Sequence, residues 1–198
     1  MFVVGIDVGI SGGLCALSGA NYPERIQATV MPIIEGTPKK GSQKGSKSKI
    51  DIVGVLRWIQ MASVTAGVPQ NTCTVILEIQ HPMAKQGVTS MFHLGESYGM
   101  LEALPQVMGW NLVQVQPKRW KNEILAGTTK DKTAAIQWCL GRYPQLDLNV
   151  GIRKVIHHDG MADAACIAQY GWQELTKQGG QDGQKDSEAP SQENSVHL

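Results

Sequence analysis

The sequence predicts an α/β fold with a mixed five-stranded sheet flanked by helices, and three observations support it. Residues 2–6 and 14–17 are apolar and flank the glycine-rich turn DVGISGG, a pattern typical of a β-hairpin. Residues 73–79 (CTVILEI) form an apolar, β-branched run, which is typical of a strand buried on both faces. After this run, segments of strand and helix character alternate. Strands that come first and then alternate with helices predict a mixed sheet.

The remaining strands and the helices follow from the same patterns. Two further strands are expected at residues 25–34 and 110–115. Asp51 can cap the first helix, which has apolar residues at amphipathic spacing, and Pro117 suits the first turn of a short one. Helices are expected at residues 50–66, 89–107, 117–125, 130–143 and 161–176.

The 198 residues suit one domain with a tail, since about 100 to 200 residues bury a sizeable core. We expect this domain over residues 1–177, with a mobile basic loop at 35–49 that holds five lysines among glycines and serines. Residues 178–198 are rich in Gln, Gly, Ser and Glu and are expected to form a disordered tail. The tail carries a net charge of −3 and the whole chain +1, so residues 1–177 carry +4. A mildly basic domain is compatible with a nucleic-acid partner.

The composition argues against a membrane protein and against a zinc protein. The hydrophobic fraction is 42%, the mean hydropathy is −0.16, and no apolar run approaches the roughly 20 residues of a membrane span. No pair of cysteines has the CxxC spacing of a zinc site. We therefore expect buried free thiols in a reducing compartment at Cys15, Cys73, Cys139 and Cys166.

Two of the expected strands carry an acid at or near their carboxyl ends. Asp7 enters the glycine-rich turn, and Glu78 lies inside CTVILEI among apolar neighbours. A buried carboxylate is costly unless it is paired or metal-bound. Because open α/β sheets place ligands beyond the carboxyl ends of their strands, the two acids would face each other if their strands are adjacent and parallel. Taken alone, an aspartate that ends a strand and enters a glycine-rich turn, as Asp7 does, is more often a turn former.

A further pair of acids lies in HHDGMADAACIA. Asp159 and Asp163 are four residues apart and so share one helix face, while Gly160 and the neighbouring alanines would let that helix pack on the sheet. Asp159 could alternatively cap the helix. Convergent carboxylates repel unless cations lie between them, and oxygen ligands suit Mg²⁺ or Mn²⁺. Together with Asp7 and Glu78, these acids predict a two-metal site for phosphodiester hydrolysis.

The ordered set of these motifs resembles the RuvC-like Holliday junction resolvases, in particular their phage and chloroplast branch. The resemblance spans residues 1–175 with gaps and implies an RNase H-like fold, Mg²⁺-dependent symmetric nicking of four-way junctions, and a homodimer packed partly through residues 89–107. It also implies a role in DNA recombination and repair. The protein would be cytoplasmic and associated with the nucleoid of a bacterial or phage-infected cell. The matching segments are GIDVGISGG at 5–13, ILEIQHP at 76–82, GVTSMFHLGESYGMLEAL at 87–104 and HHDGMADAACIAQYG at 157–171, with a weaker match in PKRWKNEILAGTTKDKTAA at 117–135.

By position, the resemblance makes Asp7, Glu78 and Asp163 the first, second and last metal ligands. Many bacterial members place another acid or a histidine three residues before the last aspartate, where this chain has glycine. Asp159 is therefore assigned as the remaining ligand, with His158 as a neighbour able to orient it. The histidines could equally be a solvated helix entry.

Most of the candidate DNA contacts lie close to Trp120 in the sequence. Basic side chains near an aromatic ring can neutralise phosphates, although a charged helix end with the ring in the core fits the pattern equally well. The resemblance ranks two lysines of this stretch first, Lys121 and Lys132, and places Lys85 in a loop that approaches the junction centre. The basic loop at 35–49 could also contact DNA. The residues assigned are Lys85, Lys118, Arg119, Trp120, Lys121 and Lys132.

Three other functions are weighed against a junction resolvase. The glycine-rich turn also looks like the phosphate loop of actin-like or sugar-kinase ATPases, but 198 residues leave no room for the second loop and second domain expected there. A non-catalytic junction binder would gain nothing from clustered acids beside phosphate. A related nuclease acting on flaps, forks or single strands is compatible with the sequence.

Overall fold

The computed structural model describes residues 1–38, 40–41, 46–82, 87–131, 133–150 and 157–185. Its central sheet has the strand order β3-β2-β1-β6-β7. The strands β1 (Phe2–Asp7), β2 (Gly13–Ser18) and β3 (Arg25–Val30) pair antiparallel. β6 (Cys73–Glu78) pairs parallel with both β1 and β7 (Asn111–Val115). The predicted mixed five-stranded sheet is confirmed.

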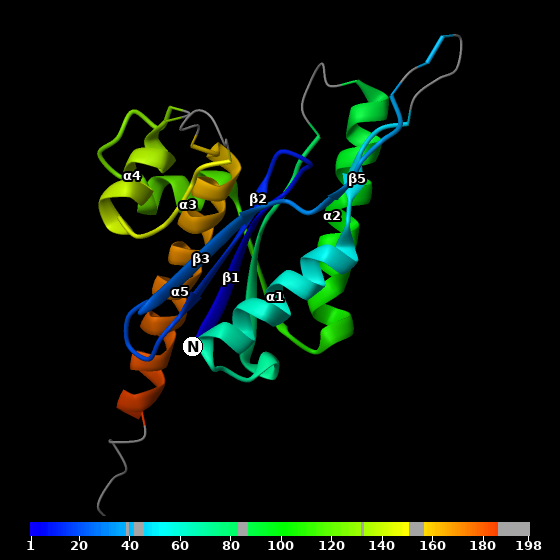
Figure 1. The fold of residues 1–198 in the computed structure, drawn as a ribbon. Helices are drawn as coiled ribbons and strands as arrows, with labels where there is room; N and C mark the ends of the chain where they lie inside the picture. Colours follow the sequence, from blue (N-terminus) through cyan, green and yellow to red (C-terminus); the bar gives the residue numbers. More distant parts are fainter. Residues whose placement is uncertain (39, 42–45, 83–86, 132, 151–156, 186–198) are drawn as a thin grey trace, which may run out of the picture.

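Helices cover both faces of this sheet (Figure 1). α1 (Ile52–Ala66) and α2 (Val88–Met108) lie on one face. α3 (Pro117–Ile124), α4 (Ala134–Arg142) and α5 (Asp159–Lys185) lie on the other. Each face buries its own hydrophobic cluster, so the fold has a core on both sides of the sheet.

The alternation of side chains along β1 assigns its residues to the two cores. Val4 and Ile6 are fully buried in the cluster beneath α1 and α2. Val3 is fully buried in the cluster beneath α5. Because successive side chains of a strand point to opposite faces, Asp7 lies on the α5 face with Val3.

The predicted third strand is interrupted. β3 ends at Val30, and β4 (Ile33–Ile34) leaves the main sheet to pair with β5 (Lys49–Ile50). Pro32 lies between the two strands, and a proline has no N–H to continue a strand ladder. Its carbonyl instead accepts a hydrogen bond from the backbone N–H of Asp51 at 2.9 Å, directly before α1.

Helix boundaries differ most from the sequence prediction in α4 and α5. α4 begins at Ala134 rather than residue 130, because Lys130 has a left-handed φ of 56° and cannot continue a right-handed helix. α5 begins two residues early, at Asp159, and continues to Lys185, so it includes the first part of the segment predicted as a tail. Residues 186–198 of that tail lie outside the described part of the chain.

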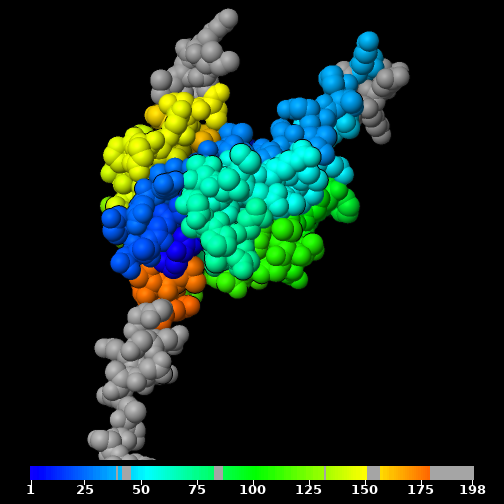
Figure 2. All heavy atoms as spheres, turned by 60° about the horizontal axis from the view of Figure 1, so that its bottom comes forward, coloured from blue at the N-terminus to red at the C-terminus, as the bar shows by residue number. Residues whose placement is uncertain are grey.

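The structure also describes the state of the cysteines and the apolar character of the helices. The four cysteines are buried free thiols, as predicted. Within the described ranges, no helix is both long and apolar enough to cross a membrane. The segment before α1, which belongs to the predicted basic loop, projects from the body of the molecule (Figure 2).

Candidate active site

Two of the predicted site residues end neighbouring parallel strands. β1 and β6 pair in register up to the residues directly before Asp7 and Glu78. Val3 of β1 and Ile76 of β6 both lie in the core beneath α5. Asp7 and Glu78 lie an even number of residues beyond them, so both belong to the α5 face. The structure therefore brings these two acids together at the carboxyl end of the sheet.

α5 approaches the sheet backbone to backbone, which carries its acids to the same place. A Cβ added to Gly5 of β1 would overlap the backbone of Ala164. A Cβ on Gly13 of β2 would lie 2.7 Å from the carbonyl oxygen of Gly160. Small residues on both elements thus seat the first turns of α5 over the end of β1, together with Asp163.

The same contact explains why position 160 holds glycine rather than an acid. A Cβ on Gly160 would lie 2.5 Å from the carbonyl oxygen of Ser11 and 2.7 Å from the backbone of Gly12. No larger side chain fits there without moving the turn after β1. The nearest position before Asp163 that can carry an acid on this side is the first residue of α5, Asp159.

The four carboxylates form one electrostatic cluster with Lys121. Burial raises the pKa of Asp7 well above its ordinary value, and the charges of Asp163, Glu78 and Asp159 raise it further. Burial also raises the pKa of Asp163 to about 6, with smaller contributions from Glu78 and Asp159. The positive charge of Lys121 lowers the pKa of both aspartates. Among the described residues, the four acids outnumber the cations that act on Asp7 and Asp163, so the site has an excess of negative charge.

Both oxygens of the Glu78 carboxylate accept a hydrogen bond. Nε1 of Trp120 donates to Oε2 at 2.5 Å, and Nε2 of Gln80 donates to Oε1 at 3.1 Å. The indole belongs to the core, since Trp120 is fully buried. Glu78 was predicted from the sequence but its two hydrogen-bond partners were not, and Trp120 lies 42 residues further along the chain.

A histidine caps the start of α5. Nδ1 of His158 accepts a hydrogen bond from the backbone N–H of Met161 at 3.2 Å, and its carbonyl accepts from Ala162 at 3.2 Å. Asp159 is exposed, and its Oδ1 accepts from the N–H of Gly160 at 3.0 Å. His158 therefore performs the capping role that was considered for Asp159, which remains at the rim of the cluster.

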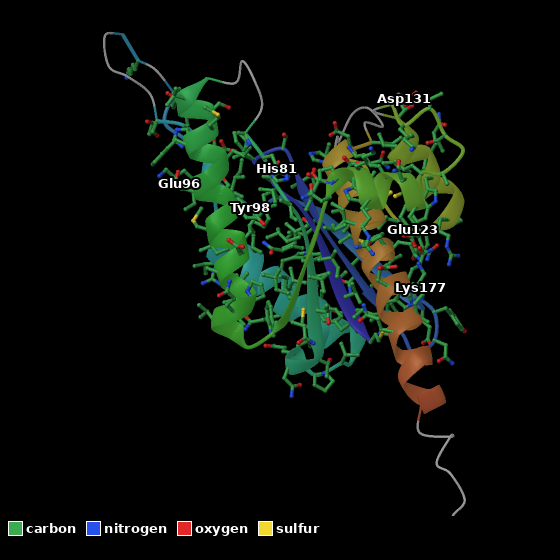
Figure 3. All side chains as sticks on the ribbon, turned by 180° about the vertical axis from the view of Figure 1, so that it is seen from behind. His81, Glu96, Tyr98, Glu123, Asp131 and Lys177 are labelled. Atoms are coloured by element: carbon green, nitrogen blue, oxygen red, sulfur yellow. The ribbon has the colours of Figure 1, made fainter. Side chains whose placement is uncertain are left out.

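A cavity of about 240 Å³ opens beside the helix acids, and it includes an acid that the sequence analysis missed. Oδ1 of Asp131 accepts hydrogen bonds from the backbone N–H groups of Thr133 and Ala134 at 2.8 and 3.1 Å, so this residue shapes the start of α4 (Figure 3). An aspartate two residues before a threonine at a helix start was the available signal. The cavity is lined by Lys121, Leu125, Lys130, Asp131, Asp159 and Asp163.

The donor set fits a hard divalent cation, although the acids are not arranged as a finished cage. In the described part of the chain, no three His, Cys, Asp or Glu side chains form a group that could hold a metal ion as they stand. Four carboxylates offer only oxygen ligands, which Mg²⁺ and Mn²⁺ prefer. Their burial and mutual repulsion, seen in the raised pKa values of Asp7 and Asp163, would be relieved by a cation.

The candidate DNA contacts fall into separate places. Lys118 and Arg119 are exposed on α3, where Nη2 of Arg119 pairs with Glu174 of α5 at 2.8 Å. Lys121 is half-buried and belongs to the acid cluster. Lys85 and Lys132 lie outside the described residues.

The assignment of Trp120 to DNA binding was wrong. Its side chain is fully buried in the cluster beneath α5, so the indole has no surface on which a base could stack. Nζ of Lys121 lies 5.1 Å from the centre of one of its rings, on the side of the acid cluster. The alternative reading of the pattern, a charged helix end with the aromatic ring in the core, describes the structure.

A larger cavity of about 440 Å³ lies between the turn after β1 and α2. Part of its wall is Lys49, the last lysine of the predicted basic loop, which donates to Oε1 of Glu96 at 2.7 Å. Nδ1 of His93 lies 3.2 Å from the other oxygen of Glu96, which Figure 3 labels on α2. The end of the basic loop is therefore fixed to α2, a short distance from the glycine-rich turn that follows Asp7.

Comparisons with known proteins identify the fold. No family model and no curated sequence matches this chain. Among solved structures, the yeast mitochondrial Holliday junction resolvase Ydc2 is similar over 89% of this chain and 80% of its own, with a TM-score of 0.50 and 16% identity. RuvC of T. thermophilus in complex with a Holliday junction substrate is similar over 85% of this chain and 90% of its own, with a TM-score of 0.48 and 16% identity. The fold conclusion rests on Ydc2, and the predicted RNase H-like fold class is confirmed.

Proposed function

We propose that this protein is a metal-dependent endonuclease that resolves four-way DNA junctions by paired, symmetric nicks. The observation that carries the proposal is the convergence of Asp7, Glu78, Asp159 and Asp163 on the α5 face of the sheet. The ordered motifs resemble RuvC-like resolvases, and the yeast protein that shares this fold is named a Holliday junction resolvase. The acid cluster and the resemblance thus support the same reaction.

Mg²⁺ is the proposed cofactor, with Mn²⁺ as a possible substitute. When two such ions are bound, they supply an activated water and stabilise the leaving oxygen of an in-line displacement at phosphorus. Asp7 and Glu78 would hold them from the sheet, and Asp159 and Asp163 from α5. Because all four acids belong to regular elements rather than loops, their positions are set by the packing of the fold.

Basic residues of α3 would guide the DNA backbone to these acids. Lys121 already lies in the cluster, so its ammonium group can neutralise a phosphate that enters it. Lys118 and Arg119 project from the same short helix into solvent. We assign them contacts with the flanking phosphates, and extend the proposal to Lys85 and Lys132 on the basis of the resemblance.

Paired nicks require two active sites, and we propose that a second copy of the chain supplies the other. One stripe of α2 carries Val88 and Phe92, which are 79% and 69% exposed. Gly95 and Gly99 continue the stripe, and a Cβ on either would meet nothing within 4 Å. An apolar stripe with two open glycines fits close packing against another helix. The resemblance implies a homodimer through this same helix.

Cleavage of defined DNA substrates tests the proposal. The protein is incubated with Mg²⁺ and labelled four-way junction, replication fork, flap and linear duplex, beside Asp7→Asn as the inactive control. Symmetric nicks in opposite strands of the junction, absent with the variant, are expected. Preferred cleavage of the fork or flap would assign the protein to another class of branched-DNA nuclease, and equal cleavage of linear duplex would refute junction specificity.

A further inference from the structure

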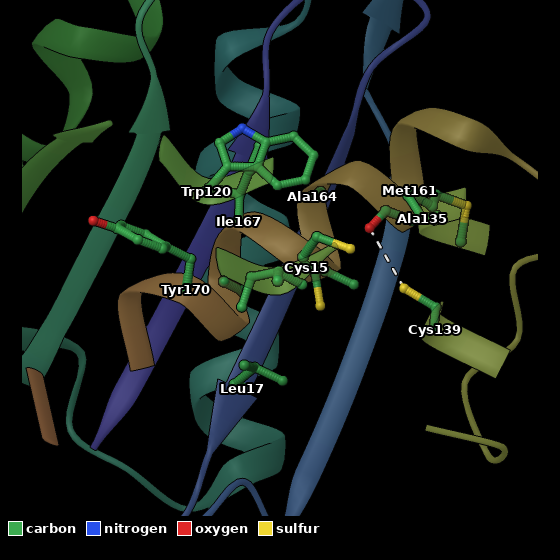
Figure 4. Close-up of a cluster of buried hydrophobic side chains, with 14 of the residues drawn as sticks. Cys15, Leu17, Trp120, Ala135, Cys139, Met161, Ala164, Ile167 and Tyr170 are labelled. Atoms are coloured by element: carbon green, nitrogen blue, oxygen red, sulfur yellow. Dashed lines mark hydrogen bonds between the residues drawn. The ribbon is translucent and has the colours of Figure 1, made fainter. Parts of the chain in front are cut away.

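The indole of Trp120 connects α3 with the acid cluster from inside the core. The side chain is 0% exposed and packs in the cluster beneath α5. Its ring nitrogen points away from the labelled Cys15 and Leu17 (Figure 4). That nitrogen donates to Oε2 of Glu78 at 2.5 Å. A buried aromatic ring thus ends on one of the proposed metal ligands.

Contacts at both ends of α3 hold the indole in this position. Arg119 pairs with Glu174 at 2.8 Å. Glu123 pairs with Lys177 at 2.6 Å, and both of these residues are labelled in Figure 3. Two ion pairs thus join α3 to α5. The apolar side of the helix is buried together with Trp120. A ring enclosed in a packed core does not change rotamer freely. Its N–H group is therefore a fixed donor aimed at Glu78.

The chemistry of this donor suits a metal ligand. An indole N–H only donates, and it carries no charge and no lone pair that could compete for a cation. Trp120 occupies one acceptor position on Oε2 of Glu78, and Gln80 occupies one on Oε1. A carboxylate has roughly four acceptor positions, so about half of them stay available to an ion. The two hydrogen bonds thus orient the carboxylate of Glu78 and leave acceptor positions for a metal ion.

We infer that Trp120 is a positioning residue that fixes the carboxylate of Glu78 for metal binding. The inference rests on the proposed function, because it takes Glu78 as a metal ligand. It gives a specific role to a residue that neither contacts DNA nor belongs to the ligand set. Groups that orient metal ligands commonly change metal affinity about 10- to 100-fold when they are removed.

Metal affinity in the absence of DNA tests this role directly. Mn²⁺ binding is measured by calorimetry for the full chain and for Trp120→Phe, which keeps an aromatic ring but loses the N–H. We expect Mn²⁺ affinity to fall about 10- to 100-fold. A benzothienyl analogue of tryptophan, introduced at position 120 by amber suppression, has nearly the shape of the indole without the N–H and should show the same loss.

Two controls separate positioning from packing. Trp172→Phe changes another buried tryptophan of the same core, nine residues or roughly 13 Å along α5 from Asp163, and should leave Mn²⁺ affinity unchanged. In a Glu78→Ala background, loss of the Trp120 N–H should have no further effect on Mn²⁺ affinity, because its acceptor is gone. Wild-type affinity in the benzothienyl variant would overturn the inference.

Failure of the positioning role of Trp120 can be distinguished from failure of the proposed nuclease function. If the wild-type chain binds Mn²⁺ and loses affinity without the Trp120 N–H, but cleaves no branched DNA, the positioning role stands and the nuclease assignment fails. If the wild-type chain cleaves junctions and the benzothienyl variant binds Mn²⁺ equally well, the nuclease assignment stands and the positioning role fails.

Discussion

Ionised Asp7 and Asp163 lower the stability of the folded state when no metal is bound. Burial raises the pKa of Asp7, and the charges of Asp163, Glu78 and Asp159 raise it further. A carboxylate whose pKa is raised in the folded state is less favourably ionised there than in the unfolded chain. At neutral pH without metal, the cluster therefore opposes folding, and a bound cation would reverse this effect.

Removing one of these charges should separate stability from activity. Asp7→Asn keeps the shape of the side chain but removes a buried, repelled charge. We expect the metal-free variant to be about 1 to 3 kcal/mol more stable to urea than the wild type, with junction cleavage at least about 100-fold lower. Val64→Thr, at a side chain that is 67% exposed on α1, serves as a control for a surface change. A destabilised Asp7→Asn variant would contradict the electrostatic account.

The pH dependence of the metal-free protein follows from the same shifts. The pKa of Asp163 is raised from 3.8 to about 6, so the folded state binds a proton more tightly than the unfolded chain. The stabilisation by this proton is full below the unfolded pKa and is lost as the pH rises through about 6. The measurement is the Tm of the wild type and of Asp163→Asn at several pH values. We expect the Tm of the wild type to fall relative to that of Asp163→Asn as the pH rises from 4 to 6. A difference that is independent of pH would exclude the shift.

The site depends on how closely α5 lies on the sheet. Gly5 of β1 contacts the backbone of Ala164, and Gly171 lies against the side chain of Ile76. These contacts leave no room for a Cβ along the line where helix and strand meet. The register of α5 on β1 fixes where Asp163 stands relative to Asp7.

Substitution of one of these glycines should move the helix. Gly5→Ala places a methyl group against the backbone of α5, and overpacking of this kind costs about 1 to 3 kcal/mol of folding free energy. We expect lower stability in urea and weaker Mn²⁺ binding, because Asp163 shifts away from Asp7. Gly141→Ala in α4 is the matched control, since its Cβ meets nothing within 4 Å and should be neutral or stabilising. Normal Mn²⁺ affinity in Gly5→Ala would show that the spacing is not critical.

The elements of this fold were largely predictable because their signals are local. The apolar runs of β1 and β6 and the helical spacing of α1 are properties of consecutive residues. Asp7, Glu78 and the helix acids could be recognised because charges in apolar strands, or one helical turn apart, are conspicuous. Two boundaries were not predicted because each depends on a single residue. Pro32 separates β4 from β3, and Lys130 delays the start of α4. A hydrophobic periodicity is a property of many residues and does not reveal such positions.

The partners of the acids could not be predicted, because they depend on tertiary contacts. The hydrogen bond from Trp120 to Glu78 joins residues 42 positions apart, and a tryptophan between an arginine and a lysine suited a DNA surface equally well in sequence. The fit of Gly160 against Gly12 also appears only when α5 meets the turn after β1. The roles of Trp120 and Gly160 follow from what surrounds them in the folded core and not from their residue types alone.

In the assembled fold, α2 exposes apolar side chains on its outer side. α2 covers the β6–β7 side of the sheet with Leu101 and Leu104, which are buried. Its opposite stripe starts with Val88 and Phe92, which are exposed. An apolar helix face of this kind is costly in water and suits a second copy of the chain. Such a dimer would place two acid clusters on one junction.

Disrupting the proposed α2 interface should abolish the proposed pairing of nicks. Phe92→Glu introduces a charge into the stripe without touching the acid cluster, so we expect a monomer by light scattering, an unchanged Mn²⁺ affinity and loss of paired nicks. Val64→Glu is the matched control, because Val64 is 67% exposed on α1, away from the stripe. A wild-type chain that is monomeric at working concentration, yet still makes paired nicks, would show that two-strand cleavage does not need the α2 interface. Monomeric Phe92→Glu that retains only single, unpaired nicks would show that each active site is complete within one chain, since the acids and Trp120 all come from the same fold.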